Sequence, residues 1–226
     1  MRRLLLALLP LTLLTGCLAP AEDTGPAPAP TTSAVDPQDG SDTPEEFAGD
    51  IEASRTIAEE YWAERLGSGF QPINDLIAYE RSGEVDCAGE PLPRNNAVYC
   101  SAGDFIAYDV NWAYAAFQQI GDAFVFYLLG HEYAHGIQAR LGIRKQFTIE
   151  QELQADCMAG AFIGDKVRED RLRMQDDDTR ELADGLAAVG DDPGQPWFAE
   201  GAHGTAEQRM DFFAKGYENS LEECGL

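Results

Sequence analysis

The segment from Asp122 to Leu141 restricts the fold more than any other part of the sequence. It is apolar at nearly every position, so a helix formed by it has no polar face to turn towards water and must lie largely inside the protein. Gly142 follows where such a helix would end. The sequence HEYAH, from His131 to His135, stands in the middle of this buried helix.

Two histidines four residues apart point in directions only about 40° apart around a helix axis, so both rings can reach one ion. Zinc is the metal that suits such a pair, and Glu132 is placed to act as a general base on a metal-bound water. HExxH is the motif of zinc peptidases. The alternative is that the motif arose by chance and the histidines are ordinary core residues. Against it, two of the chain's three histidines lie in the motif.

A catalytic zinc needs a third protein ligand and one open position. The segment from Thr148 to Asp156 offers three carboxylates. Glu152 and Asp156 share one helix face, whereas Glu150 points about 160° away from Glu152. We therefore predict Glu152 as the third ligand and Asp156 as a hydrogen-bond acceptor for the far nitrogen of a ligating histidine. Glu150 fits charge compensation at a helix N-terminus, and Cys157 points away from the metal.

The remaining periodicities and turn signals predict an α+β fold that is mainly helical with a small sheet. Capping residues place the start of helices at Thr43, at Thr148 (with Gln151) and at Thr205 (with Gln208). Besides the buried helix, helices are expected at 43–66, 148–168, 179–189 and 205–219, and strands at 73–80, 97–100 and 105–110. The folded part is expected to be one domain, 43–226.

The N-terminus has the pattern of an export signal. Arg2 and Arg3 precede an apolar run, and small residues stand just before Cys17, as in the lipobox of bacterial lipoproteins. We expect residues 1–16 to be removed, Cys17 to be lipidated and the Pro- and Ala-rich segment 17–42 to act as a tether. The alternative is an ordinary secretory signal with Cys17 incidental. Either way the domain is expected outside the cytoplasm, and with lipidation it would be held at the membrane.

Net charge excludes one class of partner. The chain has a formal charge of −24, which becomes −26 when Arg2 and Arg3 leave with the signal. Such a surface repels nucleic acid, so we expect no nucleic-acid partner. It also repels anionic lipids, which makes a covalent lipid the better explanation for residence at a membrane.

Four cysteines remain beside Cys17, and an even number in an exported domain suggests two disulfides. Sequence alone permits three pairings. We favour Cys87 with Cys100, which bracket a Gly- and Pro-containing loop, and Cys157 with Cys224, which would fix the C-terminal tail to the core. Buried free thiols are the alternative.

Several segments together resemble the bacterial neutral zinc metallopeptidases. The resemblance covers most of the domain, from about Cys87 to Tyr217, and its ELQAD segment at this distance from HExxH is more specific than HExxH alone. Ala134 and Gly136 stand where family members usually have glycine and histidine, and neither position is a ligand. The matching segments are Tyr99 to Asp109, His131 to His135 with Ile137-Gln138, Glu152 to Cys157, and His203 to Thr205 with Gln208-Arg209.

The resemblance implies a zincin-like fold with His131, His135 and Glu152 as ligands of one zinc ion and Glu132 as catalytic base. In such a site zinc lowers the pKa of its water to about 7 and polarises the scissile carbonyl, and Glu132 transfers the proton to the leaving amine. The substrate would be a peptide or protein, and the resemblance does not say which.

Three further positions have two interpretations each. His203 would either stabilise the oxyanion or belong only to a loop that leads into the last helix. Arg209 would be either a cation of the pocket or a partner for one of the many acids. The strand 105–110 would either add an extended peptide to its edge or be an internal strand.

Two other functions compete with peptide hydrolysis. One is a non-catalytic surface lipoprotein that keeps zinc for stability and serves as a binding module. Glu132 argues against it, because a structural site has no use for a base beside an open position. The other is an amidase that acts on cell-wall peptides. The sequence leaves the oligomeric state open.

Overall fold

The computed structural model describes residues 43–175, 177–191, 194–196, 198–199 and 201–226. The predicted signal sequence, the tether and Cys17 lie outside these residues. Within them, no helix combines the length and the apolar character needed to cross a bilayer.

Six α-helices and five short strands form the described part of the chain. The fold is therefore α+β and mainly helical, as the sequence predicted. In chain order the elements are α1 (Pro44–Leu66), the 3₁₀ turn η1 (Gly67–Gly69), β1 (Asp75–Tyr79), β2 (Asp86–Cys87), β3 (Glu90–Pro91), β4 (Ala97–Cys100), β5 (Phe105–Asp109), α2 (Val110–Ile120), α3 (Asp122–Leu141), α4 (Thr148–Arg168), α5 (Asp178–Ala188), α6 (Ala206–Asn219) and η2 (Ser220–Cys224).

The helix ends follow local chemistry. Thr43 accepts a hydrogen bond from the Glu46 N–H and so caps α1 as predicted. The cap of α6 is also as predicted, with Thr205 and Gln208 bonding each other's backbone N–H. Helix α3 ends at Gly142, whose φ of 67° lies in the left-handed region that glycine adopts without strain.

The predicted capping box of α4 is wrong. Phe147, not Thr148, is the N-cap residue, and the Glu150 carboxylate accepts the Phe147 N–H at 3.2 Å. The Gln151 side chain instead accepts the N–H of Lys145. An acid at the third helical position bonds the cap backbone as well as glutamine does and also complements the helix dipole. Glu150 therefore has the N-terminal role that its position suggested.

Three of the strands form a mixed sheet in the order β1-β5-β4, in which β1 is parallel and β4 antiparallel to β5. Because β5 is the central strand, the proposal that a peptide adds to the edge of segment 105–110 is wrong. Both edges of β5 are already hydrogen-bonded, and β1 and β4 are the edge strands. The sequence could not separate these cases, because an apolar strand of this length fits either place.

Helix α2 was not predicted. The predicted strand 105–110 ends at Asp109, whose buried carboxylate accepts the backbone N–H groups of Asn111 and Trp112 and so starts a helix there. The same carboxylate accepts the N–H of Asn95, which ties the approach to β4 to the start of α2. The sequence did contain a signal for this helix, because Asp109 is a favourable N-cap residue and stands directly before a segment with helical apolar spacing.

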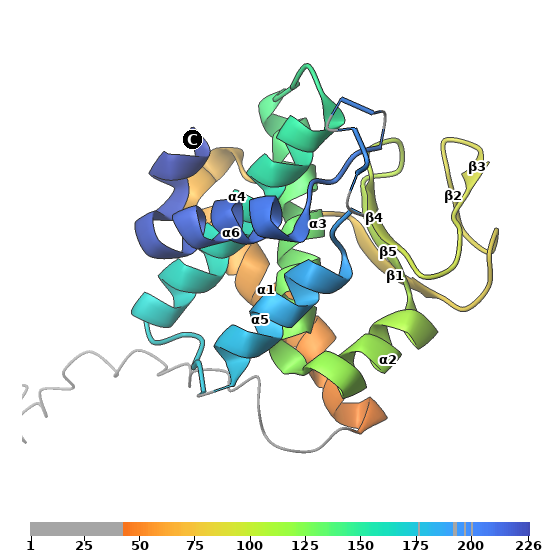
Figure 1. The fold of residues 1–226 in the computed structure, drawn as a ribbon, viewed down its shortest axis with the longest axis horizontal. Helices are drawn as coiled ribbons and strands as arrows, with labels where there is room; N and C mark the ends of the chain where they lie inside the picture. Colours follow the sequence, from red (N-terminus) through yellow and green to blue (C-terminus); the bar gives the residue numbers. More distant parts are fainter. Residues whose placement is uncertain (1–42, 176, 192–193, 197, 200) are drawn as a thin grey trace, which may run out of the picture. The chain divides into compact units, whose positions relative to one another are not determined.

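Helix α3 is the centre of the fold. Figure 1 shows the sheet on one side of α3 and helices α4 and α6 on the other. The main core cluster includes most of its side chains, as its all-round apolar sequence required. His131 and Glu132 are buried within it, with 5% and 6% of their surface exposed.

Two disulfides join the predicted cysteines. Cys87 pairs with Cys100, and Cys157 pairs with Cys224. The second bond connects α4 to the C-terminal turn η2, so the end of the chain is fixed beside the helix that carries Glu152 and Asp156.

Candidate metal centre

Three side chains from two helices converge at the middle of α3. His131 and His135 come from α3, and Glu152 comes from the first turns of α4. The Nε2 atoms of the two histidines lie 3.1 Å apart. Glu152 places Oε2 3.2 Å from Nε2 of His131 and Oε1 3.3 Å from Nε2 of His135. The structure thus brings the three predicted ligands together.

These distances fit a zinc ion. Zinc binds imidazole nitrogen and carboxylate oxygen at about 2.0–2.2 Å, so two ligands of a tetrahedral site lie about 3.3 Å apart. The two Nε2 atoms lie 3.1 Å apart, and each lies 3.2 or 3.3 Å from one oxygen of the Glu152 carboxylate, which matches this spacing. Two histidines and a carboxylate are also a donor set that zinc uses when a fourth position stays open.

Asp156 lies one turn beyond Glu152 and contacts the far side of His131. Its Oδ1 is 2.8 Å from Nδ1 of His131, as predicted for a residue that orients a ligand. The side chain is fully buried. Arg209 from α6 compensates its charge through Nε and Nη2, both at 2.9 Å, and the hydroxyl of Tyr127 donates to Oδ1 at 2.8 Å.

This network answers the question left open for Arg209. Arg209 is 3% exposed, and its guanidinium also donates to the hydroxyl of Tyr127 and the carbonyl oxygen of Val189. It is therefore the partner of one buried acid, and it also lines the cleft beside the metal centre. A buried carboxylate with four donors around it is held in one orientation.

Electrostatics at His131 depend on the same acids. Burial alone disfavours the charged imidazolium, but the carboxylates of Asp156 and Glu152 outweigh it and raise the pKa of His131 to about 10. The pKa of Glu152 is lowered: burial opposes its charge, but hydrogen bonds to His131 and His135 prevail. A metal must therefore displace a proton from this pair, so zinc binding releases a proton.

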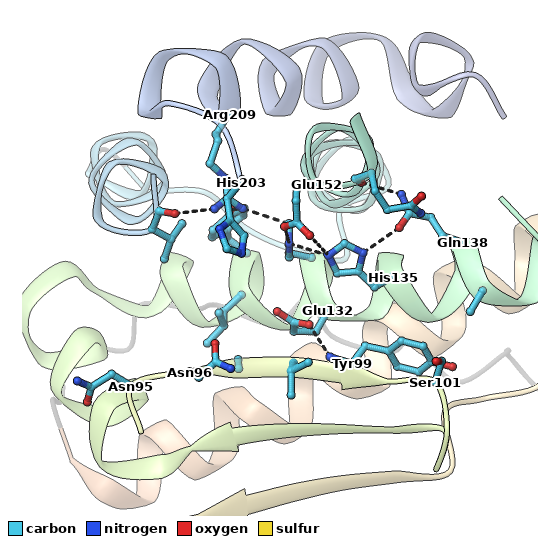
Figure 2. A pocket seen from close by; sticks show the side chains of 18 of the residues that line it. Asn95, Asn96, Tyr99, Ser101, Glu132, His135, Gln138, Glu152, His203 and Arg209 are labelled. Carbon is cyan, nitrogen blue, oxygen red and sulfur yellow. Dashed lines mark hydrogen bonds and ion pairs between the residues drawn. The ribbon is translucent and has the colours of Figure 1, made fainter. Parts of the chain in front are cut away.

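Glu132 follows His131 in α3 and lines the same cleft, on its β4 side. Its Oε2 accepts the backbone N–H of Tyr99, in β4, at 2.7 Å (Figure 2). The carbonyl oxygen of Asn96 accepts the Asp109 N–H, so Asn96 is a hydrogen-bonded position of the antiparallel pair. Because such positions alternate along a strand, the backbone N–H and carbonyl groups of Ala97 and Tyr99 point away from β5. The edge strand thus presents backbone groups on the side where Glu132 lies.

A cleft of about 700 Å³ runs between β4 and the helices and contains the metal centre. This volume lies in the range of about 300–1,000 Å³ that is typical of ligand sites. Figure 2 shows β4 along one wall, α3 behind and His203, Arg209 and Glu152 on the opposite wall. Asn95 and Asn96 line one end, and Gln138 and Ser101 line the other.

A sequence model of the family described as "Putative neutral zinc metallopeptidase" matches residues 11–225. The chain belongs to this family. Family membership implies zinc, in agreement with the donor set and spacing of His131, His135 and Glu152.

Relatives of this family member occur in Escherichia coli and Mycobacterium tuberculosis. The chain is 25% identical over 182 residues to the uncharacterized protein YpfJ of Escherichia coli K12, covering 69% of this chain and 61% of that protein. It is 30% identical over 116 residues to the uncharacterized protein Rv2575 of Mycobacterium tuberculosis H37Rv, covering 41% and 40%. The chain thus spans less than two thirds of these relatives. No solved structure matches it.

His203 lines the same cleft, with about half of its side chain exposed. The loop that carries it is held by Asp191, which accepts the N–H groups of His203 and Gly204 at 2.8 and 2.7 Å. Oδ1 of Asp191 lies 3.5 Å from Nδ1 of the ring. Both interpretations of His203 are compatible with this geometry, because the backbone forms the turn into α6 while the side chain faces the cleft.

Sequence reasoning missed the neighbours that complete the site. Tyr127 stands one turn before His131, Gln138 three residues after His135, and Gln154 two residues after Glu152. All three are polar side chains in apolar or buried helix segments. That placement could have marked them as partners of the site, because a buried polar group needs a hydrogen-bond partner. Tyr99 contributes through its backbone N–H, which no side-chain pattern reveals.

Proposed function

We propose that this protein is a zinc-dependent metallopeptidase that hydrolyses peptide bonds in extended substrates lying in the cleft. The observation that carries the proposal is that the Nε2 atoms of His131 and His135 and the Glu152 carboxylate lie 3.1–3.3 Å from one another, the spacing of ligands around one zinc ion, while Glu132 lines the same cleft. The open side of the site supports catalysis over a purely structural metal.

His131, His135 and Glu152 would hold a zinc ion, which would supply Lewis-acid chemistry and lower the pKa of the attacking water to about 7. Glu132 takes a proton from the attacking water and returns it to the amine that leaves. Its hydrogen bond to the Tyr99 N–H fixes one carboxylate oxygen, so the other is aimed at the cleft. The backbone orients the base before substrate arrives.

The substrate backbone would pair with β4, an edge strand of the sheet. Ala97 turns its N–H and carbonyl groups away from β5, and Tyr99 its carbonyl group, so an extended peptide can add to these groups as a further strand, while the Tyr99 N–H stays bonded to Glu132. On the facing wall, His203 would donate a hydrogen bond to the carbonyl oxygen as negative charge develops there, with Asp191 orienting the ring.

The test replaces the base while keeping the ligands. Glu132→Gln should bind zinc with unchanged stoichiometry and lose peptide hydrolysis by at least about 100-fold, because general acid–base catalysis contributes about 10²–10⁴-fold. Casein and peptidoglycan fragments serve as substrates in parallel, which separates a protease from an amidase of cell-wall peptides. Cleavage that persists at the wild-type rate in Glu132→Gln would refute the mechanism.

We also propose that the domain works outside the cytoplasm on a lipid anchor at Cys17. The lipobox-like sequence before Cys17 supports this, and so do two disulfides, which persist in oxidising compartments. Cells grown with a labelled fatty acid should incorporate label into the wild-type protein and not into Cys17→Ser. Equal labelling of both would exclude Cys17 as the anchor.

A further inference from the structure

The far side of His135 contacts a chain of two side-chain amides that leads to the C-terminus. Nδ1 of His135 lies 2.8 Å from Oε1 of Gln138, which is 1% exposed. Nε2 of Gln138 donates to the backbone carbonyl oxygen of Gln151 at 2.9 Å and to Oε1 of Gln154 at 3.1 Å. Nε2 of Gln154 donates to the backbone carbonyl oxygen of Cys224 at 2.9 Å.

Backbone carbonyls fix the direction of both amides. A carbonyl oxygen only accepts, so the NH₂ group of Gln138 must face Gln151 and its oxygen must face His135. The carbonyl of Cys224 fixes Gln154 in the same way, with its oxygen towards Gln138. Reversing either amide would set two oxygens against each other in a buried place, which costs about 1–3 kcal/mol per unsatisfied group.

This direction decides the tautomer of His135. Because Oε1 of Gln138 only accepts, Nδ1 of His135 must carry the proton, and the lone pair is on Nε2. Nε2 is the atom that lies 3.3 Å from Oε1 of Glu152 and 3.1 Å from Nε2 of His131. The amide chain therefore presents to the metal position the nitrogen that can ligate.

We propose that Gln138 and Gln154, together with the carbonyl of Cys224, are the positioning residues of His135, so that the C-terminal turn is part of the metal centre. Asp156 performs the matching task for His131 from the opposite side. The disulfide between Cys224 and Cys157 holds the last acceptor of the chain against α4. The inference rests on the metal site of the proposed function and adds residues beyond the ligands.

Zinc affinity of the full domain, measured by competition with a chelator, tests the proposal. Gln138→Met keeps the length of the side chain and removes the acceptor, so zinc affinity should fall by about 10- to 100-fold, the usual effect of losing a partner of a ligating histidine. Gln154→Met should have a smaller effect, because Gln138 keeps its bond to Gln151. Gln118→Met, the same change on the exposed face of α2, should leave affinity unchanged.

A second measurement does not depend on how the variants fold. In the zinc-loaded wild-type protein, ¹⁵N NMR of the histidine rings should show His135 coordinated through Nε2, with a slowly exchanging proton on Nδ1. Coordination through Nδ1 would overturn the inference, as would wild-type zinc affinity in a folded Gln138→Met variant. A wild-type protein with no measurable zinc affinity would overturn the proposed function and this inference together.

Discussion

Gly216 in α6 lies directly against the backbone of α4. A Cβ at this position would overlap the carbonyl oxygen of Cys157 and lie 2.8 Å from the N of Ala161, both in α4. These are backbone atoms of a packed helix and cannot rotate aside. Gly216→Ala therefore forces α6 away from α4.

The expected magnitude follows from two opposing effects. Alanine gains about 1 kcal/mol over glycine in a helix, whereas overpacking a core costs about 1–3 kcal/mol and more when backbone atoms collide. We expect a net loss of about 2 kcal/mol in the free energy of unfolding. For a domain of this size that lowers Tm by about 4–8 °C.

The displacement should also reach the metal centre. Arg209 lies two turns before Gly216 on α6 and holds Asp156 through two hydrogen bonds of 2.9 Å. If α6 moves outward, these bonds lengthen and His131 loses part of its support. We therefore expect zinc affinity to fall together with stability.

Urea unfolding of the metal-free domain measures the first effect, and chelator competition measures the second. Gly49→Ala is the matched control: Gly49 lies exposed in α1 with open space around it, so alanine should stabilise by about 0.5–1 kcal/mol. A Gly216→Ala variant as stable as the wild type would refute the argument from close packing. So would an equal loss in Gly49→Ala.

Two further predictions concern stability alone. Asp122, at the start of α3, is buried near four other acids: Asp50, Glu46, Glu181 and Asp178. Its pKa is raised to about 8, mainly by burial and to a lesser extent by repulsion from these acids. The folded state then holds a proton that the unfolded state releases near pH 4, so this group lowers stability as pH rises from about 4 to 8. Asp122→Asn, compared with wild type by thermal melts in EDTA, should gain stability increasingly from pH 5 to pH 8; an advantage that is equal at both pH values would contradict the shifted pKa. The disulfide between Cys157 and Cys224 closes a separation of 67 residues, against 13 for Cys87 and Cys100. The chain-entropy relation gives about 4 and 3 kcal/mol for their loss, so paired alanine substitution at 157 and 224 should destabilise more; the reverse order in urea unfolding would refute the loop-length argument.

Local patterns predicted five of the six described α-helices, all except α2, and much of the site. The apolar run around HEYAH required a buried α3, and helix periodicity alone put His131 and His135 on one face. The same periodicity selected Glu152 over Glu150, and the structure places the Glu152 carboxylate next to both rings. These inferences succeed because they depend on the geometry of one helix at a time.

Local patterns failed where two competing choices had similar local energies. Asp109 ends a strand and begins α2, and the sequence alone extended the strand through Val110. Glu150, not Gln151, bonds the backbone at the start of α4. Asp109 can end a strand or cap a helix, and Glu150 and Gln151 can each accept a backbone N–H near the start of α4. The neighbouring segments decided between these possibilities.

The sequence by itself determined the kind of site. It predicted two metal-binding histidines on a buried helix, a carboxylate ligand on the next helix and a general base beside the first histidine. Only the tertiary structure decided which strand borders the cleft, that Arg209 compensates Asp156, and that Gln138 and Gln154 connect His135 to Cys224. Spacing along one helix is fixed by bond geometry that every sequence shares. Contacts between residues as far apart in the chain as 154 and 224 depend on how whole helices pack, and no local pattern encodes that.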